Sequence, residues 1–144
     1  IGGCAGSTAC GIKIFRIQIL LAFFKTQIKK IIYPNGIFPI RYNNNKIEPA
    51  FISSVITFIY LYFLIFFIII VLLTLNGMDF VSSISGAATV ISNVGPGLGE
   101  KIGPSGNFKD LSDTSKLILS FGMLLGRLEM LAVLVLFFPA FWKN

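Results

Sequence analysis

The chain alternates long apolar runs with short polar segments. An apolar run with scattered basic residues covers residues 11–32, and a run without any charge covers residues 51–75. The second run is long enough to cross a hydrocarbon core of about 30 Å as a helix. A shorter apolar segment, residues 80–91, leads into a glycine-rich stretch, and the last predicted helix covers residues 112–142. The pattern therefore predicts a helix, a second helix, a re-entrant half-helix and a final helix.

The segments between these runs differ in charge. Residues 25–46 contain five basic residues and no acidic one, and three prolines break the helix over residues 34–49. The positive-inside rule places this connector in the cytoplasm. Residues 76–116 contain four acidic residues and three lysines, so we expect this part outside, with both ends of residues 80–99 on the same side. Helix, re-entrant helix, loop and helix form the pore-loop unit of cation channels, which predicts an all-α membrane protein.

Composition narrows the possible functions. The chain is 55% hydrophobic and 12% charged, which is far too apolar for an ordinary soluble domain. It contains no histidine, which excludes imidazole catalysis and the common zinc sites. Cys4 and Cys10 are better explained as buried packing residues than as a disulfide. We expect neither an enzyme nor a cofactor in this chain, and no nucleic-acid partner. Because residue 1 is isoleucine with no signal-peptide pattern after it, we expect a C-terminal part of a longer polypeptide or an incomplete gene fragment.

The glycine-rich stretch ISNVGPGLG, residues 91–99, is the first candidate site. Glycine and proline leave carbonyl oxygens free of helical hydrogen bonds, and at membrane depth such oxygens need buried protein, water or a dehydrated ion as a partner. We predict a filter loop over residues 92–99 that binds potassium through Asn93, Val94 and Gly95, with Ser92 and Pro96 completing the site. A plain turn between two hydrophobic helices explains the same residues.

Arg127 is the second candidate, because it lies near the middle of the last apolar run. An arginine at that depth costs a few kcal/mol unless it faces protein or water, which favours a functional role. An internal ion pair with Glu129 is the alternative, although a spacing of two places the side chains on different helix faces. Gly122 and Gly126 form a GxxxG pattern that predicts close approach to a neighbouring helix.

The third candidate is the segment GGCAGSTACGIK, residues 2–13. Its small residues have weak helix propensity, so a flexible break followed by a cation is a possible gate. Close helix packing through small residues is the simpler explanation of the segment on its own. The gate residues of this hypothesis share small size or positive charge: Gly2, Gly3, Gly6, Ser7, Thr8, Gly11 and Lys13, joined by Arg127.

Three stretches taken in order resemble one family. They are GGCAGSTACGIKIFR, SNVGPGLG and MLLGRLEMLAVLVLFFPAFW, and together they resemble the C-terminal part of the Trk/Ktr/HKT potassium transporters, closest to the TrkH type. Members of that family place four pore-loop units around one pathway. The resemblance implies that residues 1–33 hold a gate loop and the second helix of the third unit, residues 34–49 a cytoplasmic connector, and residues 50–144 the fourth unit.

The resemblance also implies roles and partners. Asn93 to Pro96 become one share of the selectivity filter, residues 2–13 an intramembrane gate loop, and Lys13 and Arg127 the basic residues near it. Cys10 departs from the glycine usual there and could stiffen the gate. The implied activity is potassium uptake across the inner plasma membrane by a multi-pass homodimer with a cytoplasmic, nucleotide-binding subunit of the TrkA type.

Two rival functions remain open on the sequence. One is an alternating-access carrier with a broken-helix binding site, and the other is a non-transporting assembly subunit held through Gly122 and Gly126. Basic residues expected on the cytoplasmic face, such as Lys29, Lys30 and Arg41, are explained by topology and contact with anionic membrane lipid as well as by a docked partner.

Overall fold

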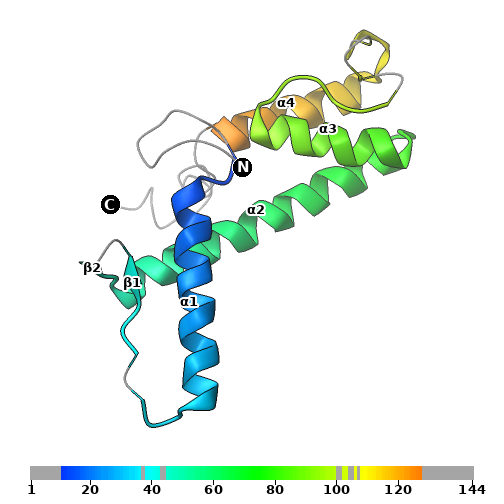
Figure 1. The fold of residues 1–144 in the computed structure, drawn as a ribbon. Helices are drawn as coiled ribbons and strands as arrows, with labels where there is room; N and C mark the ends of the chain where they lie inside the picture. Colours follow the sequence, from blue (N-terminus) through cyan, green and yellow to red (C-terminus); the bar gives the residue numbers. More distant parts are fainter. Residues whose placement is uncertain are drawn as a thin grey trace, which may run out of the picture. The chain divides into compact units, whose positions relative to one another are not determined.

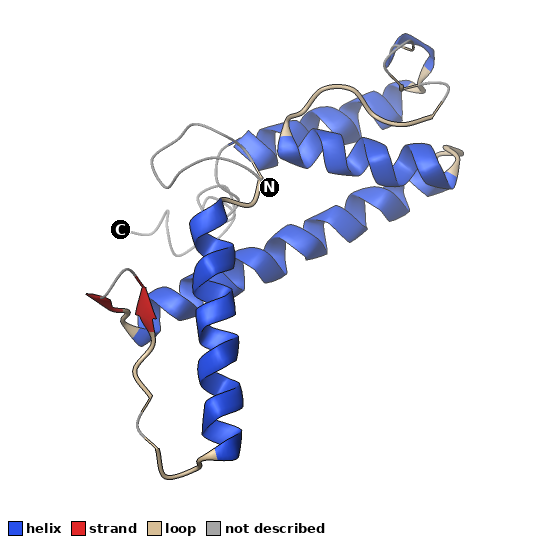
Figure 2. Ribbon diagram, viewed as in Figure 1, coloured by secondary structure: helices blue, strands red, loops and turns tan. Residues whose placement is uncertain are grey.

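The computed structural model describes residues 11–36, 38–42, 45–99, 102–103, 106 and 108–127. The described part is dominated by helices, which follow one another along the chain as Figures 1 and 2 show. They are α1 (Ile14–Ile32), α2 (Pro49–Leu75), α3 (Phe80–Ser92) and α4 (Asp113–Arg127), with a 3₁₀ turn at Phe108–Asp110. The chain forms two compact units, Ile1–Tyr60 and Leu61–Asn144, so α2 contributes to both.

In the first unit, α1 packs on the first part of α2 through a small apolar core. Ile19, Ile52 and Val55 are buried there. The Arg16 guanidinium lies 3.6 Å from the centre of the Phe58 ring, a cation–π contact that supports a charge on an apolar helix. The first turn of α1 has no side-chain cap, whereas Lys29 and Lys30 in its last turn complement the negative end of the helix dipole.

A short antiparallel hairpin follows α1. Strands β1 (Arg41–Tyr42) and β2 (Asn45–Lys46) pair with Arg41 opposite Lys46 and Tyr42 opposite Asn45. The Tyr42 hydroxyl donates to Gln18 Oε1 of α1 at 2.9 Å. The sequence predicts a polar connector here, but it does not predict the two paired strands. Two residues on each side are too few to change the all-helical class.

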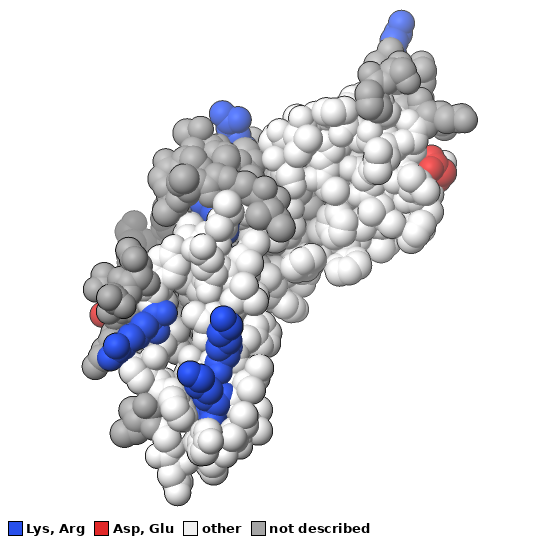
Figure 3. All heavy atoms as spheres, viewed as in Figure 1, with Lys and Arg blue, Asp and Glu red and all other residues white. Residues whose placement is uncertain are grey.

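Basic side chains gather over the C-terminal half of α1, and Figure 3 shows them in blue. Basic residues that the sequence predicts to face the cytoplasm therefore lie on the surface of α1. Within the described residues, α2 is the helix that is long and apolar enough to cross a membrane, by length and composition. The crossing predicted for residues 11–32 stays a prediction.

In the second unit, α2 ends in a tight turn. The Met78 amide donates to the Leu73 carbonyl, and Gly77 adopts a positive φ of 81°. This is the usual way in which a glycine closes a helix C-terminus. Asp79 then caps α3, since its Oδ2 accepts from the Ser82 amide at 3.0 Å. The predicted break between residues 75 and 80 is thus built from two adjacent caps.

The core of the second unit lies between α3, α4 and the second part of α2. Ala87, Val90 and Ile91 of α3 are buried against Ile69 and Leu119. The glycines of the GxxxG pattern make this packing close. A Cβ added at Gly122 would lie 2.8 Å from Val90 Cγ1, and one at Gly126 would collide with the Ile91 carbonyl oxygen. The predicted close approach is confirmed: both glycines lie against the short helix α3, and Gly122 also lies against Ile69 of α2.

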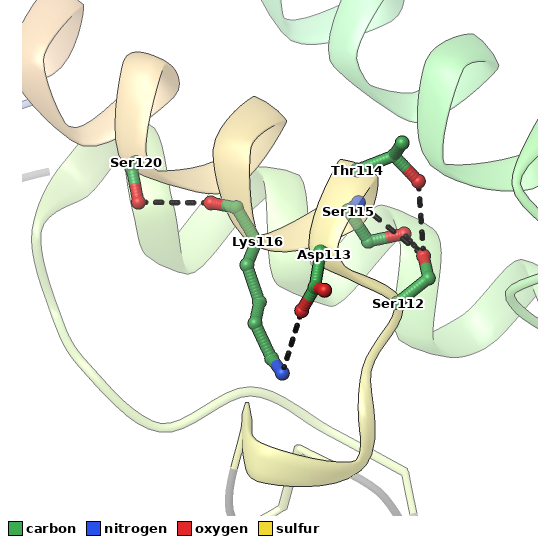
Figure 4. Close-up of polar contacts among 6 residues, drawn as sticks. All are labelled: Ser112, Asp113, Thr114, Ser115, Lys116 and Ser120. Atoms are coloured by element: carbon green, nitrogen blue, oxygen red, sulfur yellow. Dashed lines mark hydrogen bonds and ion pairs between the residues drawn. The ribbon is translucent and has the colours of Figure 1, made fainter.

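Hydroxyl groups fix the start of α4, as Figure 4 shows. Ser112 Oγ accepts from the Ser115 amide and shares a 2.9 Å hydrogen bond with Ser115 Oγ. The Thr114 hydroxyl donates to Asn76 Oδ1 at 2.7 Å, which ties α4 to the end of α2. Lys116 and Asp113 form an exposed ion pair at 3.4 Å, a kind that contributes little stability. The start of α4 is therefore joined to the end of α2, close to the point where α3 begins.

The predicted helices lie close to those observed. The helix predicted over residues 51–75 begins two residues earlier, because Pro49 suits the first helical position. The half-helix predicted over residues 80–91 extends to Ser92. The last helix begins at Asp113 and is described to Arg127, so the remainder of the prediction over residues 112–142 lies outside the described residues.

Candidate functional site

The candidate site begins where α3 ends. Asn93 has left-handed backbone angles (φ 51°, ψ 43°), and the Val94 amide donates to the Thr89 carbonyl at 2.9 Å. This bond spans five residues, which is a hydrogen-bonding pattern that commonly closes the C-terminus of a helix. Asparagine tolerates the left-handed conformation better than most residues. The chain therefore leaves α3 abruptly, and we call residues 93–98 the extended segment.

The extended segment has few internal hydrogen bonds. Within the described part of the chain, no donor is bonded to the carbonyl oxygens of residues 93–97. Gly95 has a φ of 110°, which L side chains rarely adopt, and a Cβ there would meet nothing within 4 Å. Val94 and Leu98 are exposed. The segment thus carries a run of carbonyl oxygens that are not used in helical bonding.

The Leu98 end of the extended segment is held against α3 and against the returning chain. Ser85 Oγ accepts from the Leu98 amide at 3.0 Å and lies 2.9 Å from the Leu98 carbonyl oxygen. The Gly97 amide donates to the Ile102 carbonyl at 2.8 Å, and a Cβ at Gly97 would lie 2.6 Å from Ile102 Cδ1. A larger residue at position 97 would therefore displace the Ile102 side chain.

The Asn93 end is held by α4. Asn93 Nδ2 donates to the Met123 carbonyl at 3.2 Å, and a Cβ at Gly126 would lie 3.1 Å from Asn93 Nδ2. Arg127 follows Gly126 as the last described residue of α4, and its side chain is exposed. The structure consequently brings the end of α4 that carries Arg127 to the beginning of the extended segment.

A cavity of about 270 Å³ lies beside Gly95, between α3 and α4. Its lining is mainly apolar and includes Thr89, Phe108 and Met123. Thr89 is buried, and its hydroxyl has no hydrogen-bond partner among the described residues. The Ser92 hydroxyl, at the start of the predicted filter loop, shares a 3.1 Å hydrogen bond with the Tyr62 hydroxyl of α2. Helices α2, α3 and α4 therefore each contribute a residue to the site.

The predicted gate is described only in part. Gly2, Gly3, Gly6, Ser7 and Thr8 lie outside the described residues. Gly11 has a positive φ of 85°, and Lys13 is the residue that precedes α1. Gly11 and Lys13 belong to the first compact unit and Arg127 to the second.

Several contacts of the site were not predicted from the sequence. They involve Ser85, Ile102 and the Asn93 side chain. A signal for Ser85 exists, because a hydroxyl in a short apolar helix at membrane depth needs a hydrogen-bond partner. The sequence offers no comparable signal for Ile102, which is one isoleucine among many.

Comparison with known proteins gives consistent results over the whole chain. The family model described as TrkH, cation transport protein, matches residues 1–144. The chain is 47% identical over 144 residues to the Trk system potassium uptake protein TrkI of Halomonas elongata. It is 35% identical over the same length to the Trk system potassium uptake protein TrkH of Escherichia coli. All 144 residues are matched in each case, and they span 29% of each relative's length.

A solved structure agrees with this result. The crystal structure of the potassium transporter TrkH from Vibrio parahaemolyticus matches with a TM-score of 0.87 and 34% identity. The match covers 99% of this chain and 30% of that one. The fold is thus that of an all-α membrane protein, as predicted. The chain belongs to the TrkH family of cation transport proteins.

Proposed function

We propose that the protein containing this chain takes up potassium ions as the ion-conducting subunit of a Trk-type system in the inner plasma membrane. The observation that carries the proposal is the extended segment. Its carbonyl oxygens, which accept no hydrogen bond from the described residues, follow a short capped helix in a chain of the TrkH family. The relatives named above are potassium uptake proteins, which supports potassium as the ion. In this proposal the ion is a transported substrate, and the chain needs no cofactor.

The proposed chemistry is the replacement of water by backbone oxygens. The carbonyls of Asn93, Val94 and Gly95 take the place of part of the hydration shell of the ion, with Ser92 and Pro96 completing the site. The C-terminal end of α3 lies next to them, and the negative end of a helix dipole favours a cation there. One such segment cannot surround an ion, so the proposal includes three further segments from the rest of the protein.

We extend the proposal to a gate formed by residues 2–13 and Arg127. Its support is the position of Arg127, one residue after the glycine that packs on Asn93. A positive charge close to the pathway of a cation raises the barrier to passage through electrostatic repulsion. The partners in this proposal are a second copy of the protein and a cytoplasmic nucleotide-binding subunit of the TrkA type. The basic C-terminal half of α1 provides charge for such docking or for anionic lipid.

The decisive variant is Gly95→Ser in the full-length protein. Serine has no steric neighbour at this position, so its effect comes from the unfavourable positive φ and not from a clash. We expect a lower preference for potassium over sodium, measured by uptake of the two ions in cells that lack other potassium uptake systems. Gly77→Ser is the matched control, because Gly77 also has a positive φ and no neighbour within 4 Å but lies in the turn before α3.

The outcomes separate the rival functions. A changed ion preference in Gly95→Ser alone supports a filter, whereas loss of substrate binding supports an alternating-access carrier. Unchanged transport supports an assembly subunit and contradicts the proposal. In the same assay we expect Arg127→Ala to increase the leak of potassium, and unchanged or reduced flux would contradict the gate.

A further inference from the structure

We propose that Ser85 is a positioning residue that clamps the Leu98 end of the extended segment and thereby contributes to ion selectivity. This inference rests on the proposed function. Ser85 lies in the middle of α3, seven residues before the helix ends, and does not belong to the predicted filter loop. Its hydroxyl reaches residue 98, thirteen positions further along the chain. The proposed role is therefore exerted through the backbone and not through contact with an ion.

The clamp uses both groups of one residue's backbone. Ser85 Oγ accepts from the Leu98 amide at 3.0 Å and donates to the Leu98 carbonyl at 2.9 Å. A weaker contact of 3.4 Å joins the same hydroxyl to the Ser82 carbonyl. A hydroxyl has one hydrogen and two lone pairs, so it can satisfy the donor and the acceptor of Leu98 at once. Alanine at residue 85 would leave both groups without this partner.

The clamp has a counterpart at the other end of the segment. There the Val94 amide is bonded to Thr89 and the Asn93 side chain to Met123. Between these anchors, the carbonyls of residues 94–97 have no hydrogen bonds within the described part of the chain. A segment that is fixed at both ends has fewer accessible conformations than one that is fixed at a single end, because each fixed residue loses backbone freedom. The spacing of the ion-coordinating oxygens consequently depends on both anchors.

Close contacts next to the clamp leave little other room. A Cβ at Gly99 would collide with Ser82 Oγ, so the chain passes directly over the first turn of α3. On its open side, Ser85 lines a groove of about 560 Å³ together with Phe80, Ile84 and Leu98. An added methyl group at residue 85 therefore has space. Because this side is open, Ser85→Thr is a conservative variant that keeps the hydroxyl.

The test compares four variants of the full-length protein by their uptake of potassium and sodium and by their amounts in the membrane. We expect Ser85→Ala to lower the potassium preference at least about two- to tenfold, which is the effect of one net hydrogen bond, because the variant removes both bonds to Leu98. Ser85→Thr should keep the native preference. Ser54→Ala is the matched control, because that hydroxyl only bonds to the Ala50 carbonyl within α2. Gly95→Ser reports on the filter itself.

Each outcome decides one question. A lowered preference in Ser85→Ala with native behaviour of Ser85→Thr and Ser54→Ala supports the clamp. A native preference in Ser85→Ala together with a changed one in Gly95→Ser overturns the clamp and leaves the filter. Native preference in both overturns the filter and the clamp with it. If Ser85→Ala does not reach the membrane, Ser85→Cys carries the test, since it keeps the size and weakens both bonds; a native preference in it overturns the clamp.

Discussion

Helices α2 and α3 are both apolar, yet different properties of the sequence define them. Helix α2 has 27 residues, and large apolar side chains cover most of its circumference, exposed as well as buried. Helix α3 has 13 residues and buries small ones, among them Ser82, Ser83 and Gly86. Polar groups cap α3 at Asp79 and Asn93. Helix α2 is therefore defined by length and hydropathy, and α3 by individual contacts.

The difference agrees with the lengths of the two helices. A helix long enough to cross a bilayer gains stability from almost any apolar side chain, because lipid tails accept them equally well. A helix of 13 residues is too short to place both of its ends in water across a bilayer, so the unpaired backbone groups at its ends need partners inside the protein. Substitutions in α3 and its contacts should consequently have large and specific effects. Three substitutions test this, ordered by the expected loss of stability in the full-length protein, and Gly122→Ala serves as a matched comparison for the first.

Gly126→Ala should have the largest effect. Its new Cβ would meet the Ile91 carbonyl oxygen, which belongs to the backbone of α3 and cannot turn away like a side chain. We expect a loss of about 3 kcal/mol or more in stability, at the upper end for overpacked positions, together with loss of potassium uptake. Thermal unfolding in detergent measures the first effect and ion uptake the second.

Gly122→Ala is the matched comparison from the same GxxxG pattern. Its Cβ would lie 2.8 Å from Val90 Cγ1 and 2.9 Å from Ile69 Cδ1, which are the ends of side chains. These groups can shift, so we expect a cost of about 1 kcal/mol. Equal effects of the two variants would show that the backbone contact between α4 and α3 has no special weight.

These two glycines also show what the sequence can predict. Their spacing indicated close helix packing, and the break at residues 76–79 indicated the start of α3, because both signals are local. The partner of the glycines was not predictable, since α2 and α3 both offer apolar surfaces. The same limit applies to Ser85 and Leu98, which meet only because the extended segment folds back along α3. The residue types in the sequence therefore indicate where the site lies, but the contacts between residues far apart in the sequence become known only from the structure.

Asn93→Ala should have an intermediate effect. It removes the hydrogen bond to the Met123 carbonyl. It also places alanine, which has a Cβ but no polar side chain to form local hydrogen bonds, in the left-handed conformation. The two losses together should cost about 2 kcal/mol. Asn93→Gly separates them, because glycine adopts the left-handed conformation easily but cannot make the bond. If Asn93→Gly is as unstable as Asn93→Ala, the backbone conformation contributes nothing measurable.

Asp79→Ala should have the smallest effect of the three substitutions, because it weakens only the first turn of α3. The carboxylate accepts from the Ser82 amide at 3.0 Å, and replacing such a cap by alanine costs about 1 kcal/mol. Asp79→Ser keeps a side-chain oxygen at the same position and should restore most of the stability. The unfolding temperature of both variants in detergent provides the measurement. A native unfolding temperature for Asp79→Ala would show that the start of α3 is fixed by its packing alone, in the way that α2 is fixed by its apolar length.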